Sequence, residues 1–319
     1  MSQVENNPFK YSDTNKRYHT YDYYLRHRFG EKCAKIPLDC GFTCPNIDGK
    51  CGYGGCIYCL GGSGARIVSG LLPIEEQYEN ARAKMQGKWQ TSKLIPYLQA
   101  YTNTYTSPDI LENLLNRVGA LDGAVMIDIA TRGDCLDEGI IEVLGRASKR
   151  IPITVELGLQ SASDETSRLI NRGHDFKTFE DGFNRLRAGA PLVKIGIHII
   201  NGLPGETPND MKNTATRVAK LHPDLVKIHL LHVLRGTVLA KMYENGEYTP
   251  MDRQEYIETV CDQIELLPQD IVIERVTGDG LAQELLAPLW SKKKVTVIND
   301  IDKMLFERNS YQGKNYIKN

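Results

Sequence analysis

The sequence lacks the features that would place it in a membrane or outside the cell. No stretch of its 319 residues approaches the run of about 20 apolar residues that a membrane helix needs. Residues 1–8 contain no apolar segment typical of a signal peptide. The net charge is only −1, so no global basic field points to nucleic acid. Because the cysteines come without an export signal, we expect a cytoplasmic protein with no membrane partner.

The chain also has no internal repeat and no second Cys-x2-Cys pair, but it contains one dense group of thiols. Four of the eight cysteines lie within the sixteen residues from Cys44 to Cys59, and Cys40 lies just upstream. Thiolates packed this closely usually bind metal, because sulfur is a soft, anionic ligand. Glycine and proline separate them and let the backbone wrap a compact inorganic group.

Three kinds of site compete for this loop. Structural zinc needs four ligands, usually as two pairs, and only Cys56-x2-Cys59 forms such a pair. A disulfide framework is typical of small secreted chains, whereas this chain is long and its other cysteines are scattered. An iron–sulfur cluster held by three cysteines fits best, and it leaves one iron open for chemistry. The third thiolate would come from Cys40, Cys44 or Cys51.

The spacing and its flanking residues resemble a known family. Cys44-x11-Cys56-x2-Cys59, with the aromatic Tyr58 inside the last pair, is similar to the cluster loop of radical S-adenosylmethionine (radical SAM) enzymes. The flanking sequences Gly-Phe-Thr-Cys-Pro-Asn and Gly-Gly-Cys-Ile-Tyr-Cys resemble the bacterial YhcC/YtqA-type branch, which is related to the elongator catalytic-subunit radical SAM domain. The similarity covers nearly the whole chain, from about residue 17 to about residue 300.

This resemblance implies a set of ligands and cofactors. Cys44, Cys56 and Cys59 would hold a 4Fe–4S cluster next to Tyr58, and the pattern requires no other cysteine. S-adenosyl-L-methionine (SAM) would bind the fourth iron through its amino and carboxylate groups. A flavodoxin- or ferredoxin-like reductant would supply the electron that cleaves SAM to methionine and a 5′-deoxyadenosyl radical.

Short β-rich segments alternate with helical patterns along the chain, which predicts an α/β fold with a parallel sheet. The resemblance implies the partial (β/α)6 TIM-like barrel of the radical SAM core. We expect strands at 35–39, 95–101, 124–130, 153–159, 193–200 and 225–231. We expect helices at 74–87, 108–119, 137–148, 163–170, 176–188 and 208–220.

We divide the chain into three parts. Residues 1–34 form an N-terminal helical segment that packs on the core. Its aromatic and basic stretch 17–29 is typical of an amphipathic helix, and base stacking on nucleic acid is the alternative. Residues 35–237 form the core, with the cluster loop at 40–64. Residues 238–319 form a C-terminal extension with one more strand and turn at 271–280 and a final helix near 295–308.

Ligands bind parallel α/β folds at the carboxyl ends of the strands, so polar residues there are site candidates. Thr102, Asn103 and Thr104 follow the second strand, where radical SAM proteins hold the amino group of SAM. A turn that caps the next helix is the alternative. The cluster of Asp128, Thr131, Arg132 and Asp134 after the third strand would face substrate or form a local ion pair.

The fourth and fifth strands supply the remaining candidates. Glu156 lies among apolar neighbours, where a carboxylate is costly unless it is paired. The spacing of Gln160 and Arg172 resembles that in oxygen-independent coproporphyrinogen oxidase, which implies contacts to the SAM ribose and carboxylate. Alternatively, Arg172 is a cation at a helix end that Gly173 caps. His198 would contact SAM or be a satisfied core histidine.

The substrate is the least determined feature. Kinship with the elongator domain and the basic, aromatic ends favour tRNA or another RNA. From residue 289 onward there are seven Lys/Arg against three Asp/Glu, which suits an RNA backbone or a solvated helix face. Two alternatives stay open. One is a radical SAM enzyme acting on a small metabolite or cofactor precursor. The other is a non-catalytic zinc-loop protein that binds nucleic acid.

Overall fold

A curled parallel sheet forms the centre of the molecule. The computed structural model describes residues 7–61, 72–86, 91–278 and 283–318. Within these ranges, seven parallel strands form one sheet in the order β1-β2-β3-β4-β5-β6-β8. These strands are β1 (Ala34–Leu38), β2 (Leu94–Leu98), β3 (Ile127–Thr131), β4 (Ile153–Gln160), β5 (Lys194–Asn201), β6 (Leu225–Leu230) and β8 (Val272–Arg275).

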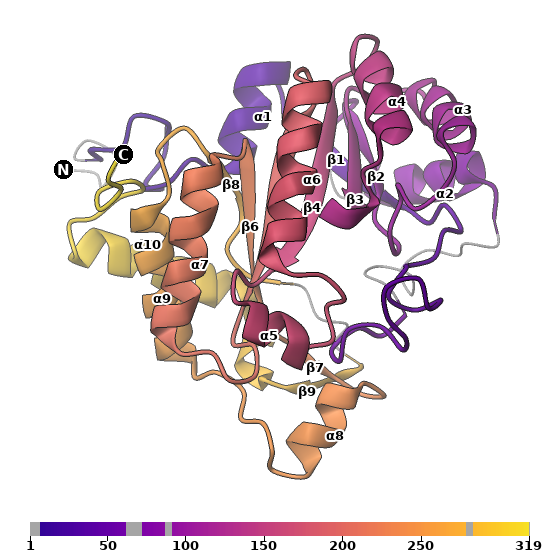
Figure 1. Ribbon diagram of the computed structural model, residues 1–319. Helices are drawn as coiled ribbons and strands as arrows, with labels where there is room; N and C mark the ends of the chain where they lie inside the picture. The colour runs from indigo at the N-terminus through magenta and orange to yellow at the C-terminus, as the bar shows by residue number, and fades with distance from the viewer. Residues whose placement is uncertain (1–6, 62–71, 87–90, 279–282, 319) are drawn as a thin grey trace.

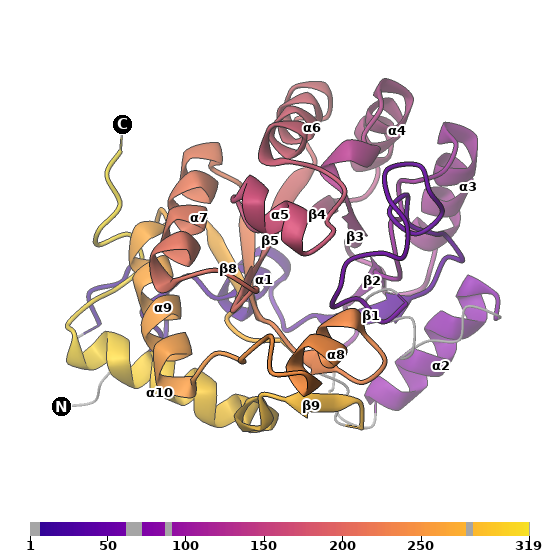
Figure 2. The same ribbon diagram turned by 60° about the horizontal axis from the view of Figure 1, so that its bottom comes forward.

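Helices surround the outer face of this sheet, and its inner face lines an open half-barrel (Figures 1 and 2). The α-helices are α1 (Tyr21–Phe29), α2 (Ile74–Gln86), α3 (Pro108–Gly119), α4 (Glu138–Ser148), α5 (Asp164–Leu169), α6 (Phe176–Gly189), α7 (Pro208–Leu221), α8 (Val238–Glu244), α9 (Arg253–Leu266) and α10 (Lys294–Glu307). Short 3₁₀ helices η1 (Gly133–Cys135) and η2 (Leu289–Lys292) and an antiparallel pair, β7 (Val233–Leu234) with β9 (Leu285–Ala287), complete the described elements. The predicted partial TIM-like barrel is confirmed.

All six predicted core strands and all six crossover helices occur, the helix at 108–119 with its predicted bounds and the other elements with shifted ends. Residue 87, the last of one predicted helix, lies outside the described residues, as do residues 1–6, 62–64 and 279–280 of other predicted segments. The helices begin where short polar side chains accept a hydrogen bond from the first turn, as Ser107 and Asp137 do. Thr207 and Asp210 form a reciprocal capping box, with Pro208 at the first helical position as predicted.

Side chains that alternate along a strand divide between the hydrophobic core and the inner face of the half-barrel. Along β4, Val155, Leu157 and Leu159 belong to the hydrophobic core between sheet and helices. Because successive side chains point to opposite faces, Glu156 and Gln160 lie on the other face, inside the half-barrel. The same sequence pattern that builds the core therefore directs polar groups inward.

The two ends of the chain complete the sheet. β8 comes from the segment expected as a C-terminal extension and pairs with β6, so the sheet has one strand more than the six predicted for the core. On its other side, Thr20 forms a parallel bridge to Ile273. Thr20 also caps α1, which explains why the N-terminal helix begins at Tyr21 and not at Arg17. No described helix is both long and apolar enough to cross a bilayer.

Candidate cofactor site

The cysteine-rich loop follows β1 at the carboxyl ends of the strands, where parallel α/β folds bind ligands. It contains almost no regular structure. A two-residue bridge between Asp48 and Tyr53 forms a small hairpin, closed by a hydrogen bond of 3.1 Å from Gly49 N to Gly52 O. Gly54 and the residue after it both have a φ of 75°, a conformation that glycine adopts without strain. The loop can therefore turn sharply between its second and third cysteines.

The three predicted ligands lie in one region of this loop. Cys56 is buried, while Cys44 and Cys59 are partly exposed. A hydrogen bond of 2.9 Å from Cys59 N to Cys56 O closes the turn of the tight pair. The phenol of Tyr101 lies near both Cys44 and Cys59 of the pair. Its partial burial raises its pKa, and the nearby Cys59 and Cys44 raise it further.

The spacing of the thiols bears on which metal they suit. A tetrahedral zinc with Zn–S bonds of about 2.3 Å brings its sulfur ligands within about 4 Å of one another. In the described part of the chain, one group of three potential ligand atoms lies within 4.8 Å of one another, and it consists of Asp128, Glu156 and Glu274. No three thiols of the loop form such a group among the described residues, so the loop is not drawn together as a preformed zinc site.

A short turn after α5 clamps the loop in place. We call residues Ile170–Gly173 the clamp turn. Ile57 N donates to Ile170 O at 3.1 Å. The side chain of Asn171 donates to the loop carbonyls of Tyr53 and Gly55, at 3.0 and 2.8 Å. Because Asn171 has a φ of 52°, its backbone turns left-handed and directs the side chain back to the loop.

Arg172 in the clamp turn meets the cluster loop directly. Its Nη1 donates to Cys56 Sγ at 3.8 Å, and its Nη2 donates to Gly158 O. The residue is buried, and its Nε has no hydrogen-bond partner within the described ranges. A buried guanidinium that keeps one donor unused suits an anionic ligand. The helix-end alternative does not match the structure, because the C-cap of α5 is Ile170 and the left-handed residue that follows this cap is Asn171, with a φ of 52°, and not Gly173.

Gln160 lies beside Arg172, as the predicted shared role requires. A Cβ on Gly158 would lie 2.8 Å from Gln160 Nε2 and 2.9 Å from Arg172 Nη2. Only glycine leaves room for both polar side chains at the end of β4. Tyr58 lies on the other side of Cys56, at the edge of an apolar cluster that includes Ile170. Burial raises the pKa of Tyr58 well above its usual value, so its phenol stays neutral.

The segment Thr102–Thr104 lies against the loop, but its side chains are engaged in the fold. Thr102 N donates to Thr43 O, next to Cys44, at 3.2 Å. Asn103 Nδ2 contacts three carbonyls at the ends of β2 and β3, and the Thr104 hydroxyl donates to Cys135 O at 2.6 Å. Besides the backbone, the buried Asn103 Oδ1, which has no hydrogen-bond partner among the described residues, is the part of this segment that suits a ligand. Of the cluster after β3, Arg132 and Asp134 form the local ion pair that was one of the two expectations.

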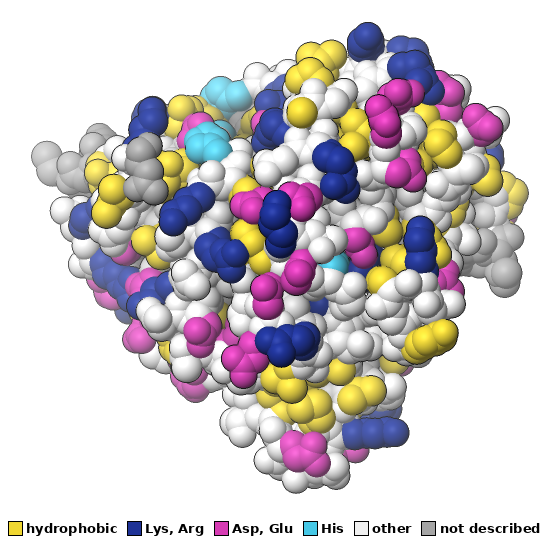
Figure 3. Space-filling view, in the orientation of Figure 1, with side chains coloured by type: hydrophobic (Ala, Val, Ile, Leu, Met, Phe, Trp, Pro, Cys, Tyr) yellow, Lys and Arg dark blue, Asp and Glu magenta, His cyan; other side chains and the backbone are white. Residues whose placement is uncertain are grey.

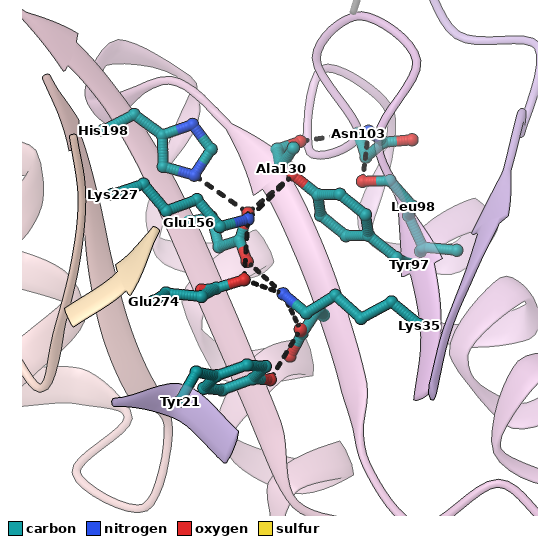
Figure 4. Close-up of polar contacts among 11 residues, drawn as sticks. Tyr21, Lys35, Tyr97, Leu98, Asn103, Ala130, Glu156, His198, Lys227 and Glu274 are labelled. Atoms are coloured by element: carbon teal, nitrogen blue, oxygen red, sulfur yellow. Dashed lines mark hydrogen bonds and ion pairs between the residues drawn. The ribbon is translucent and has the colours of Figure 1, made fainter. Parts of the chain in front are cut away.

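Glu156 is the centre of an ionic network inside the half-barrel (Figure 4). Its carboxylate accepts hydrogen bonds from Lys227 at 2.5 Å, Tyr97 at 2.6 Å, His198 at 2.9 Å and Lys35 at 2.9 Å. The predicted need for partners is thus met by four donors. Glu156 and His198, both candidates for the cofactor site, contact each other.

Every strand of the main sheet contributes one side chain to this network. The carboxylates of Asp128 on β3 and Glu274 on β8 complete it, each in contact with Lys35 on β1. β1 and β8 are the two edges of the sheet and do not pair with each other. The Lys35–Glu274 contact therefore joins the two edges across the open barrel. Tyr21 of α1 reaches the network from the N-terminal side, donating to Asp128 at 3.3 Å.

The network sets unusual protonation states. Burial alone would raise the pKa of Glu156, but Lys227 and Lys35 hold it well below 4.5. Burial raises the pKa of Asp128 to about 6 in spite of Lys35. Burial and the charge of Lys227 lower the pKa of His198 to about 4. At pH 7, His198 is therefore neutral and donates its Nε2–H to an ionised Glu156.

Sequence reasoning missed the partners that complete both parts of the site. Lys35 on β1 and Tyr97 on β2 were not among the candidate site residues, and Glu274 lies in the segment expected as a C-terminal extension. Lys35 carried a usable signal, since a lysine in a strand raises the same pairing question as Glu156. Asn171 gave no such signal in the sequence, because its contacts to the loop depend on a left-handed turn of the backbone.

Comparison with known protein families gives two matches. Residues 47–218 match the model of the Radical SAM superfamily, and residues 223–307 match the Radical_SAM C-terminal domain. YtqA of Bacillus subtilis is 43% identical over 98% of this chain and 96% of its own length. YhcC of Escherichia coli K12 is 31% identical over 89% of this chain and 90% of its own length.

More distant similarities are to one protein named for tRNA and to two solved structures. A tRNA uridine(34) acetyltransferase of Methanocaldococcus jannaschii is 26% identical over 72% of this chain, which spans 49% of that protein. Among solved structures, the archaeal Methanocaldococcus infernus Elp3 superposes with a TM-score of 0.66 at 19% identity, over 88% of this chain and 64% of Elp3. Methylornithine synthase superposes with a TM-score of 0.51 over 91% of this chain and 86% of its own length. Both structures share the fold.

Proposed function

The chain belongs to the radical SAM superfamily and is a radical SAM enzyme, and from this membership we propose that Cys44, Cys56 and Cys59 bind the 4Fe–4S cluster. When bound and reduced, the cluster would supply the electron for reductive cleavage of SAM. The observation that carries the assignment is the clamp turn, which seats the only buried thiol of the loop's Cys56–Cys59 pair against Arg172. A structural zinc loop would not need a buried, incompletely paired guanidinium at one of its thiols.

The surrounding residues divide the work of binding. Arg172 and Gln160 would hold the carboxylate and ribose of SAM, because they lie together at the end of β4. The backbone of Thr102–Thr104 would meet its amino group. Glu156 and His198 lie in the ionic network and would order the floor of the barrel under the cofactor. Tyr58 would shield the cluster from water.

We further propose that the substrate is tRNA or another RNA. The relatives named as tRNA uridine(34) acetyltransferases support this, as does the rim of the site. Tyr53 at the loop hairpin is 78% exposed, and its ring covers Gly49, where a Cβ would lie 2.5 Å from the ring. Next to it, Lys50 Nζ lies 4.9 Å from the centre of the Tyr105 ring. Fixed aromatic rings beside a cation suit an unpaired base of an RNA loop.

The aromatic and basic residues at this rim would have to bind RNA without a surrounding basic surface. Figure 3 shows Lys and Arg interspersed with Asp and Glu over one face of the molecule, without a field of single sign. The net charge of −1 agrees with that pattern. Affinity for RNA would then come from stacking and a few phosphate contacts, so we expect it to depend less on salt than in a strongly basic protein.

The first test is anaerobic reconstitution followed by addition of SAM and a one-electron reductant of the flavodoxin or ferredoxin class, or dithionite. Wild type is expected to produce 5′-deoxyadenosine and Cys56→Ala none. Protein that binds zinc, loads no iron and produces no 5′-deoxyadenosine would contradict the proposal.

A second test addresses the RNA substrate. Tyr53→Ala is expected to weaken tRNA binding, by roughly the 1–3 kcal/mol that one stacked base contributes. Tyr243 on α8, which is 37% exposed, supplies a matched control, since Tyr243→Ala removes an exposed aromatic ring from a different element. Both variants should keep their iron and their basal 5′-deoxyadenosine formation. Equal tRNA binding by wild type and Tyr53→Ala would count against an RNA-stacking rim.

A further inference from the structure

Asn46 lies two residues after the first predicted ligand and reaches the second. We propose that Asn46 tunes the reduction potential of the cluster by donating a hydrogen bond to Cys56 Sγ. The inference rests on the proposed function, because it requires a cluster at Cys56. Asn46 is the last residue of the flanking sequence Gly-Phe-Thr-Cys-Pro-Asn, but the spacing of the cysteines gives it no role.

The side chain of Asn46 is fully buried at 0% exposure. Its Nδ2 donates to Cys56 Sγ at 3.7 Å and to the carbonyl of Asn171 at 2.5 Å. The main chain is fixed at the same place, since Gly55 N donates to Asn46 O at 2.9 Å. The amide thus joins the cluster loop to the clamp turn and contacts the ligand sulfur in between.

The orientation of this amide is determined by its surroundings. A rotated amide would set Oδ1 against the carbonyl oxygen of Asn171, and two acceptors repel each other. On its other side, Oδ1 lies 2.1 Å from where a Cβ of Gly52 would be and 2.6 Å from that of Gly173. Oδ1 itself has no hydrogen-bond partner among the described residues. The two glycines therefore make room for an amide whose NH2 end serves both Cys56 and the clamp turn.

Hydrogen bonds to ligand sulfurs are one of the levers that set cluster potentials. An N–H donor withdraws charge from the thiolate and stabilises the reduced, more negative cluster. Arg172 donates to the same sulfur at 3.8 Å, so two donors converge on Cys56. Arg172 has a proposed role with SAM, whereas Asn46 faces away from solvent and serves only the sulfur and the turn. We therefore assign to Asn46 a positioning role whose readout is the potential.

The test is a reductive titration of the reconstituted enzyme followed by electron paramagnetic resonance. Asn46→Ala is expected to shift the midpoint potential of the cluster to more negative values, because one donor to Cys56 is lost. Asn171→Gly is the matched control. It removes two hydrogen bonds to the loop, tolerates the φ of 52° and leaves the Asn46–Cys56 contact in place. It should loosen the cluster, seen as faster iron loss to a chelator, with an unchanged potential.

Unchanged potential in Asn46→Ala, or equal shifts in both variants, would overturn the inference. Asn46→Asp is the variant to use if Asn46→Ala loads no cluster, because it keeps the size of the side chain and removes the donor. It should shift the midpoint potential to still more negative values. If neither Asn46 variant loads iron while Asn171→Gly does, the amide is a structural requirement and the inference fails. A wild type that loads no cluster overturns the proposed function itself, whereas the other outcomes leave it standing.

Discussion

Lys35 offers the sharpest test of how the half-barrel holds its shape. Its ammonium contacts three carboxylates, those of Asp128 at 2.5 Å, Glu156 at 2.9 Å and Glu274. The ligand atoms of these carboxylates lie within 4.8 Å of one another. Lys35→Met keeps the apolar stem and removes the charge. Among the described residues, Lys227 would then be the lysine left in the network, and it pairs with Glu156 and Glu274 only.

The expected loss is large. Removing one partner of a buried ion pair costs about 3–5 kcal/mol, because the other charge stays buried without compensation. Lys35 keeps 21% of its side chain exposed, so we expect the lower part of this range at pH 7, about 3 kcal/mol. Urea unfolding of wild type and variant at equal cluster content measures the difference. The double variant Lys35→Met/Glu274→Met removes the pair that joins the sheet edges, and it should recover about 2 kcal/mol.

The pH dependence of this loss separates electrostatics from packing. Burial raises the pKa of Asp128 to about 6. At pH 5 that carboxyl is largely protonated in the folded protein, so fewer charges depend on Lys35. The destabilisation by Lys35→Met should therefore shrink between pH 7 and pH 5. A loss that is the same at both pH values, or a double variant as unstable as the two single variants added together, would refute the network as the cause.

Three further predictions concern single residues. Cys51→Ser should retain iron after reconstitution, whereas Cys44→Ser should lose it, and iron loss in both would contradict the ligand set. His198→Gln should make the free energy of unfolding depend less on pH between about 4 and 6.5. Because the folded pKa of His198 is about 4 against 6.5 for free histidine, the unfolded chain binds the extra proton and wild-type stability falls as pH drops through this window, by up to about 1.4 kcal/mol per pH unit. Gly173→Ala should destabilise the clamp turn by roughly 1–3 kcal/mol, because its φ is 78° and its Cβ would lie 2.6 Å from Asn46 Oδ1, and iron retention reports the effect.

Much of the fold was predictable because it depends on local patterns. The β-rich runs and the helix-capping residues determine the elements, and a parallel sheet follows from their alternation. The seventh strand was harder, since Val272–Arg275 is only four residues long and belongs to the sheet through pairing with β6. Its short apolar run predicted a strand but did not say which sheet it would join.

The site was predictable only where chemistry depends on residue type. Thiol spacing identified the loop, and the cost of a buried carboxylate identified Glu156. The partners of these residues come from distant parts of the chain, and strand alternation cannot rank them. Asn46 and Asn171 are recognisable only in three dimensions, because each donates to a backbone carbonyl of the other segment, Asn46 to the clamp turn and Asn171 to the cluster loop. The residue type shows which buried polar side chains need a partner, and the arrangement of the strands and loops determines which partner lies beside them.

The ionic network and the candidate SAM contacts Gln160 and Arg172 meet on β4. Glu156 fixes the middle of the strand to the network, and Gln160 ends it at a φ of 76°, after a register shift against β5. Gly158 between them carries the carbonyl that anchors Arg172. The network therefore fixes the strand whose last residues position the SAM candidates. Loosening the network should displace Gln160 and Arg172 together, which would raise the KM for SAM while the iron content stays unchanged.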